Sequence, residues 1–156
     1  MSHPKPVIST SFSYETFEET LDIKPKGAKL HIGIPKETAF QENRIALTPD
    51  AVSVLVSNGH EVTIEHNAGE AAHFGDRDYS EAGARIVYQR EDVYKAPILV
   101  KSAPVIEEDL PLLQLNQMII SPIHLTALKA ELLQKMMEKR ITAISFENLK
   151  DDSGTY

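Results

Sequence analysis

Three side chains that could bind or react with a small anionic ligand stand where apolar runs give way to polar ones. Arg44 lies between the apolar run at 30–34 and a helix expected from Thr48. Lys101 ends the run "PILVK", and His124 follows the run "QMIIS". A guanidinium pairs with a carboxylate through two parallel hydrogen bonds, which an ammonium does not do. An imidazole exchanges protons near neutral pH.

Each position also has a plainer interpretation. Arg44 can be a solvated loop arginine, and His124 can be a half-buried histidine at a strand end. Ligands of α/β proteins gather where strands end at the carboxyl edge of the sheet. The elements around the three residues therefore decide between the two interpretations.

Short apolar strands alternate with helices from residue 29 onward. Thr48 is a helix N-cap with Pro49 at the first helical position, and Gly59 ends that helix. We expect strands at 29–35, 61–66, 84–88, 97–101, 117–121 and 141–147, helices at 48–58, 76–82, 90–96 and 125–140, and one or two helical turns at 107–113. This alternation predicts an α/β fold with a doubly wound, mostly parallel sheet and helices on both faces.

Composition excludes several classes of function. The 156 residues carry a formal net charge of -7, which argues against a nucleic-acid or anionic-membrane surface. The chain has no cysteine, so disulfides and thiolate chemistry are excluded. No run of about 18 apolar residues suits a membrane helix, and we predict neither membrane contact nor a metal site. A cytoplasmic location is expected.

The glycines do not form a dinucleotide fingerprint. None of the seven glycines stands in a G-x-G-x-x-G after a strand. We therefore predict no cofactor-binding residue in this chain. Residues 1–28 differ in composition from the rest and are expected to be an arm or linker that docks on other protein, which leaves 29–156 as the folded domain.

Five motifs in order give the chain a family resemblance. They are "GIPKE" at 33–37, "RIALTP" at 44–49, "GHEV" at 59–62, "AGE" at 68–70 and "AGA" at 82–84. The chain resembles the amino-terminal domain of the alanine dehydrogenase and pyridine nucleotide transhydrogenase α-subunit family. The resemblance implies a Rossmann- or flavodoxin-like substrate domain, truncated before a second domain that binds NAD, in an enzyme that forms oligomers.

The resemblance also implies roles for the three residues. Such enzymes interconvert a small 2-amino acid and its 2-oxo acid. Arg44 would hold the substrate carboxylate, Lys101 would polarise the carbonyl and His124 would serve as acid and base. The family's substrate lysine stands two residues before a proline, and if Pro104 is that proline, Ser102 takes its place and Lys101 falls one residue early.

Two alternatives remain open at this point. "SAP" at 102–104 is closer to the transhydrogenase pattern, whereas transhydrogenases have no histidine where His124 stands. The chain could then belong to an enzyme that transfers hydride between NAD(H) and NADP(H). It could also be a degenerate paralogue that has lost catalysis and acts as a regulator.

Overall fold

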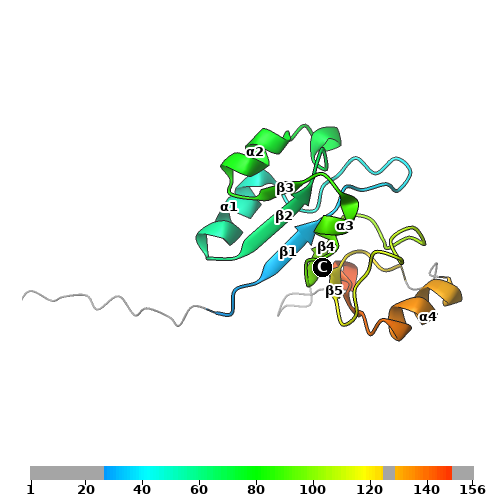
Figure 1. Ribbon diagram of the computed structural model, residues 1–156. Coiled ribbons are helices and arrows are strands. Elements are labelled where there is room, and N and C mark those ends of the chain that lie inside the picture. Colours follow the sequence, from blue (N-terminus) through cyan, green and yellow to red (C-terminus); the bar gives the residue numbers. More distant parts are fainter. Residues whose placement is uncertain (1–26, 125–128, 149–156) are drawn as a thin grey trace, which may run out of the picture.

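Six parallel strands form a single sheet. The computed structural model describes residues 27–124 and 129–148. Within them the strands are β1 (His31–Ile34), β2 (Glu61–Glu65), β3 (Arg85–Val87), β4 (Ile98–Val100), β5 (Met118–Ile120) and β6 (Thr142–Ile144). Their order is β3-β2-β1-β4-β5-β6, and every neighbouring pair is parallel (Figure 1). The expected α/β class is confirmed.

Helices cover both faces of this sheet. The helices are α1 (Pro49–Ser57), α2 (Asp76–Glu81), α3 (Arg90–Val93) and α4 (Ala130–Glu138). One apolar cluster joins Val52 of α1 and Tyr79 of α2 to the sheet, and the other joins Val93 of α3 and Met136 of α4 to it. In Figure 1, α1 and α2 lie beside β2 and β3, while α4 lies beyond β5. The doubly wound arrangement predicted from the sequence is therefore present.

The side chains of β4 show the alternation that this packing requires. Leu99 belongs to the cluster of α3 and α4, whereas Ile98 and Val100 pack against the cluster of α1 and α2. Successive side chains of a strand point to opposite faces. A strand buried on both faces is apolar throughout, as "ILV" is.

The start of α1 is determined by local sequence. Thr48 has extended backbone angles, and its hydroxyl accepts a hydrogen bond from the Ala51 N–H at 3.4 Å. Pro49 follows at the first helical position, where the missing N–H costs nothing. Asn58 caps the helix, and Gly59 follows with φ of 89°. This left-handed angle favours glycine and turns the chain into β2.

Two expected helical segments differ from the structure. Residues 107–112 form consecutive turns in which Asp109 accepts backbone hydrogen bonds from Leu112 and Leu113, and no regular helix forms there. Pro111 explains this, because it lacks an N–H and disfavours helical angles in the residue before it. The other is the helix expected at 125–140, where α4 begins at Ala130. Residues 125–128 lie outside the described residues.

We predict that Gly33→Ala destabilises the fold. A β-carbon at this position of β1 would lie 2.6 Å from the Val93 carbonyl oxygen and 2.9 Å from the Ala96 β-carbon. Overpacking of this kind costs about 1–3 kcal/mol, measurable as the free energy of unfolding in urea. Gly75→Ala is the control, since its β-carbon would come no closer than 3.6 Å to another side chain. Equal stability of the two variants would contradict the prediction.

Candidate functional site

The strand order reverses between β1 and β4. Both strands are central, and they pair with each other through Ile32 and Gly33 of β1. In an open parallel sheet the crevice for a ligand lies outside the carboxyl ends of the two strands at such a switch point. Here the crevice falls beside Lys36 and Glu37, which follow β1, and Lys101 and Ser102, which follow β4.

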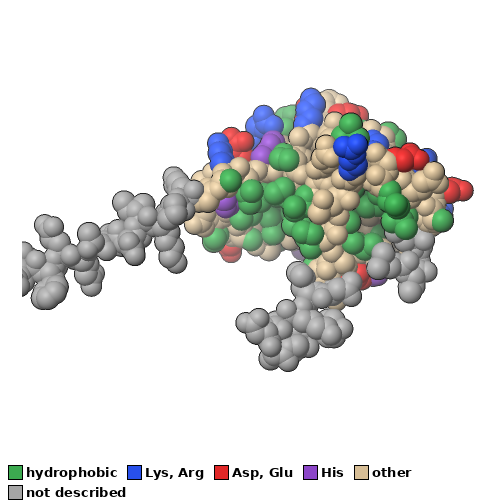
Figure 2. Space-filling view, turned by 90° about the horizontal axis from the view of Figure 1, so that it is seen from below, with side chains coloured by type: hydrophobic (Ala, Val, Ile, Leu, Met, Phe, Trp, Pro, Cys, Tyr) green, Lys and Arg blue, Asp and Glu red, His purple; other side chains and the backbone are tan. Residues whose placement is uncertain are grey.

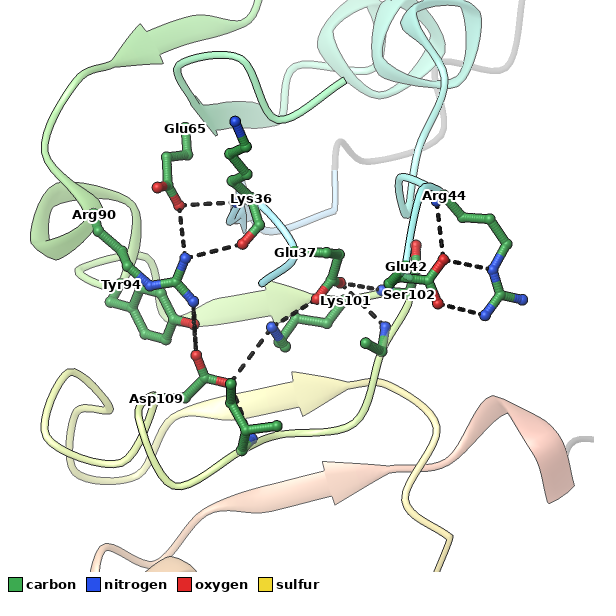
Figure 3. Close-up of polar contacts among 12 residues, drawn as sticks. Lys36, Glu37, Glu42, Arg44, Glu65, Arg90, Tyr94, Lys101, Ser102 and Asp109 are labelled. Carbon is green, nitrogen blue, oxygen red and sulfur yellow. Dashed lines mark hydrogen bonds and ion pairs between the residues drawn. The ribbon is translucent and has the colours of Figure 1, made fainter. Parts of the chain in front are cut away.

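A buried lysine occupies this switch point. The side chain of Lys101 is 2% exposed, and its Nζ lies 2.9 Å from Glu37 Oε2 and 3.5 Å from Asp109 Oδ2 (Figure 3). Both carboxylates are also buried. A charge removed from water requires partners of this kind. The lysine therefore lies where it was predicted, at the end of β4, and it is held by two anions.

Glu37 joins the two central strands. Its other carboxylate oxygen, Oε1, accepts hydrogen bonds from the backbone N–H of Ser102 at 2.6 Å and of Ala103 at 3.2 Å. The Glu37 carboxylate, which follows β1, thus accepts hydrogen bonds from the lysine and from two backbone N–H groups that follow β4. Glu37 therefore holds the backbone conformation of residues 101–103.

Asp109 connects Lys101 to a second cation. Its Oδ1 accepts hydrogen bonds from Arg90 NH2 at 2.8 Å and from the Tyr94 hydroxyl at 2.6 Å. Burial alone would raise the pKa of Asp109, but Lys101 and these hydrogen bonds lower it overall. Burial and the neighbouring carboxylate raise the pKa of Tyr94. Arg90 also donates to the Lys36 carbonyl at 2.9 Å and lies 3.4 Å from Glu65.

Arg44 lies on the loop between β1 and α1, and its side chain is 76% exposed. Its Nε and NH2 groups donate to the two oxygens of Glu42 at 2.8 and 2.6 Å. The hydrogen bonds from Arg44 lower the pKa of Glu42 to about 2. One edge of the guanidinium is therefore paired. Within the described residues, its NH1 group donates no hydrogen bond.

Arg44 and Lys101 line one cavity. Its volume is about 190 Å³, and Ser102 lines it as well. The remaining lining comes from Ile45, Ala46, Val100 and Phe146. The structure thus brings together two of the three residues singled out from the sequence, and it places Ser102 beside them.

His124 stands four residues after the end of β5. It lines a different cavity, whose volume is about 570 Å³. Its Nδ1 lies 2.6 Å from Glu147 Oε1, and its backbone has a left-handed φ of 45°. Phe40, Val105, Ile123 and Leu132 are among the apolar lining residues of this cavity. Because β5 adjoins β4, His124 and Lys101 leave neighbouring strands at the same edge of the sheet.

Four carboxylates of these sites carry no predicted role in binding or catalysis. Glu37 lies within the "GIPKE" motif and Glu42 stands two residues before Arg44, so both were within reach of motif reasoning. Asp109 gave no signal, because it falls in a segment expected to be helical. Glu147 stands at the end of the strand expected at 141–147, and nothing in the sequence connects it to His124.

We predict that Asp109→Asn destabilises the chain by at least about 3 kcal/mol. Removing one member of a buried ion network leaves its partners uncompensated, here Lys101 and Arg90. Because the folded-state pKa of Asp109 is lowered from 3.8, its contribution is complete above that pH and is lost as the pH falls further. Urea denaturation at neutral pH measures the effect.

The control for this prediction is Glu81→Gln. Glu81 pairs with Arg77 on the surface of α2, where both side chains are mostly exposed. Loss of such a pair changes stability by less than about 1 kcal/mol. A loss below about 1 kcal/mol for Asp109→Asn as well would show that the buried network does not hold the fold.

Comparisons with known proteins agree with this architecture. An alanine dehydrogenase of Staphylococcus epidermidis is 33% identical over 126 residues, which cover 81% of this chain and 34% of that protein. Alanine dehydrogenase 2 of Staphylococcus aureus is 34% identical over 121 residues, covering 78% and 32%. The chain thus spans about a third of the length of these relatives.

Solved structures show the same fold. An L-alanine dehydrogenase superposes with a TM-score of 0.77 and 36% identity, covering 81% of this chain and 35% of its own. A transhydrogenase from Sinorhizobium meliloti shares the fold with a TM-score of 0.69 and 24% identity, covering 75% and 35%. Alanine dehydrogenase is the better match of the two. The family model "Alanine dehydrogenase/PNT, N-terminal domain" matches residues 33–156, and the chain belongs to this family.

Proposed function

We propose that residues 29–156 form the substrate domain of an NAD-dependent alanine dehydrogenase-like oxidoreductase. The reaction is the reversible oxidative deamination of a small 2-amino acid to its 2-oxo acid. The observation that carries the proposal is the shared cavity of Arg44 and Lys101 at the switch point. An arginine and a lysine that line one small cavity suit a ligand that bears both a carboxylate and a carbonyl oxygen.

Arg44 is proposed to bind the substrate carboxylate. Glu42 occupies the edge formed by Nε and NH2. The opposite edge, formed by NH1 and the second hydrogen of NH2, has the same fork geometry. Because Glu42 fixes the guanidinium plane, less rotamer entropy is lost when a carboxylate binds there.

Lys101 is proposed to polarise the carbonyl. An ammonium has three N–H donors, and Glu37 and Asp109 offer acceptors for two of them. The third donor is proposed to serve the carbonyl oxygen of a bound substrate. His124 is proposed as the acid and base for the oxygen and nitrogen of the substrate, since an imidazole can both donate and accept a proton near neutral pH.

We propose that the described residues contribute little to binding a dinucleotide. In sheets that bind one, a glycine-rich turn leads from the first strand directly into a helix. Here α1 begins 15 positions after β1 ends, and Glu37 and Lys101 fill the switch point. We therefore assign NAD, which accepts or donates the hydride, mainly to the NAD-binding domain of the full-length chain.

Exposed apolar side chains support further protein contacts. Phe40 is 92% exposed, and Met137 and Leu115 are also largely exposed. Figure 2 shows apolar patches separated by polar ones on the face seen from below. We propose the NAD-binding domain and further copies of the chain, in a homo-oligomer, as partners. No helix among the described residues is long and apolar enough to cross a bilayer, and we propose a cytoplasmic location.

The alternative is a transhydrogenase α-subunit domain that binds no oxo acid. It is favoured by Ser102, which lines the cavity where a substrate lysine would be expected. The pairing of Lys101 with two buried carboxylates favours, in addition, a regulatory paralogue without catalysis. Turnover of alanine and NAD by the full-length protein would exclude the regulator. Hydride transfer between dinucleotides, without a response to pyruvate, would support the transhydrogenase.

We predict that Arg44→Lys in the full-length protein raises the KM for pyruvate by about 10- to 100-fold. The bidentate contact with the carboxylate is lost, and a charge-assisted hydrogen bond contributes about 1.5–3 kcal/mol. Arg77→Lys is the control, because Arg77 is an exposed arginine of α2 that pairs with Glu81. An unchanged KM in the Arg44 variant would remove Arg44 from the substrate site.

We predict that His124→Asn lowers kcat by about 10²- to 10⁴-fold, the range expected for loss of a general acid or base. Asparagine is chosen because it tolerates the left-handed backbone of this position. His73→Asn is a matched control, since His73 is exposed and also has a positive φ, of 64°. Equal kcat values for the two variants would exclude His124 as the acid and base.

A further inference from the structure

We propose that Glu147 is a positioning residue that orients the imidazole of His124 for proton transfer. This inference rests on the proposed function, in which His124 is the acid and base. Glu147 belongs to a short 3-10 helix (Phe146–Asn148) that follows β6. The glutamate therefore reaches His124 from the neighbouring strand of the sheet.

A single carboxylate holds both the backbone and the ring of His124. Glu147 Oε2 accepts hydrogen bonds from the backbone N–H of Ile123 at 3.1 Å and of His124 at 3.3 Å. The Ser145 hydroxyl donates to the same oxygen at 3.1 Å. The other oxygen, Oε1, lies 2.6 Å from Nδ1 of the imidazole. The carboxylate is thus fixed by three donors independent of the ring.

These contacts keep Glu147 ionised. Burial acts to raise its pKa, but the hydrogen bonds from His124, Ile123 and Ser145 lower it overall. An ionised carboxylate only accepts hydrogen bonds, so the 2.6 Å contact between Oε1 and Nδ1 favours the ring form that carries its proton on Nδ1. Nε2 is left as the ring nitrogen that exchanges a proton with the substrate.

The backbone of His124 depends on the same residue. A left-handed φ of 45° is unfavourable for histidine, and the two N–H groups bound by Glu147 lie at this turn. The carboxylate therefore holds the backbone from which the side chain leaves, and its second oxygen lies against Nδ1 of the ring. It also stabilises the positive charge that the imidazole gains when it takes up a proton.

The test is Glu147→Gln in the full-length protein, assayed with alanine and NAD. We expect kcat to fall at least about 10-fold, because an acid and base without its orienting partner loses efficiency. The KM for alanine should stay within about two-fold, since Arg44 is untouched. An unchanged kcat would overturn the inference.

Glu107→Gln is the matched control. Glu107 lines the same cavity as His124, but it pairs with Lys129, and both side chains are largely exposed. Its replacement removes one carboxylate from the cavity rim without touching the imidazole, so kcat should stay within about two-fold of wild type. An equal loss in both variants would mean that cavity charge, and not the position of His124, sets the rate, which would overturn the inference.

A double variant separates positioning from damage to the fold. In a His124→Asn background, Glu147→Gln should cause almost no additional loss of kcat, because its effect acts through the imidazole. Misfolding would instead lower kcat in both backgrounds by a similar factor. Losses that multiply would therefore overturn the inference.

Histidine NMR tests the geometry without turnover. In full-length protein labelled with ¹⁵N-histidine, the His124 signals are identified by their absence in His124→Asn. We expect Nδ1 to be protonated in the neutral ring of the wild type and this preference to weaken in Glu147→Gln. A neutral ring protonated at Nε2 in the wild type would overturn the inference. Protonation of Nδ1 in the wild type without any turnover of alanine would contradict the proposed function but not the position of the imidazole.

Discussion

A lysine buried between two carboxylates holds the centre of this fold. Lys101 lies at the end of β4, its Nζ faces Glu37 from the end of β1, and Asp109 lies on the far side. These are the two strands between which the sheet reverses its order. An ion network links the ends of these strands, and Arg44 and Ser102 line a small cavity at the same edge of the sheet.

The same network restricts what the site can do. Buried ion pairs contribute little net stability, but removal of one partner is costly. Lys101 therefore cannot leave both carboxylates for a substrate without a large penalty, and any catalytic role must use the donor that remains. Arg44 and His124 differ from Lys101, because their side chains are exposed and each is paired with a single glutamate. The molecule thus combines a fixed cation at its centre with two accessible groups on its rim.

The sequence predicted the sheet well, for physical reasons that particular elements show. Thr48 and Pro49 determine where α1 begins, and the fully apolar "ILV" of β4 indicates a strand buried on both faces. The one or two helical turns expected at 107–113 do not continue into a regular helix, because Pro111 lacks an N–H and restricts the residue before it. Helix caps and apolar strands are determined by residues close together in the sequence, which is why the sequence predicted them.

The site was less predictable. Arg44, Lys101 and His124 were found through motifs and their places at strand ends. The pairings of Lys101 and His124 were not, because Glu37 lies 64 residues from Lys101 and Glu147 lies 23 residues from His124. Pairings over such separations depend on the three-dimensional register of neighbouring strands, which residue spacing does not reveal. The sequence showed that Lys101 falls one residue early if Pro104 is the family's proline, but it did not show that Lys101 is buried between two anions.

A crystal structure of the full-length protein with pyruvate and NAD bound would test the central claim most directly. The account predicts that the pyruvate carboxylate lies within hydrogen-bond distance of Arg44, that its carbonyl oxygen faces Lys101, and that NAD is held mainly outside residues 29–156. Pyruvate bound away from Arg44, or a nicotinamide ring with no oxo acid beside the Arg44 and Lys101 cavity, would contradict it.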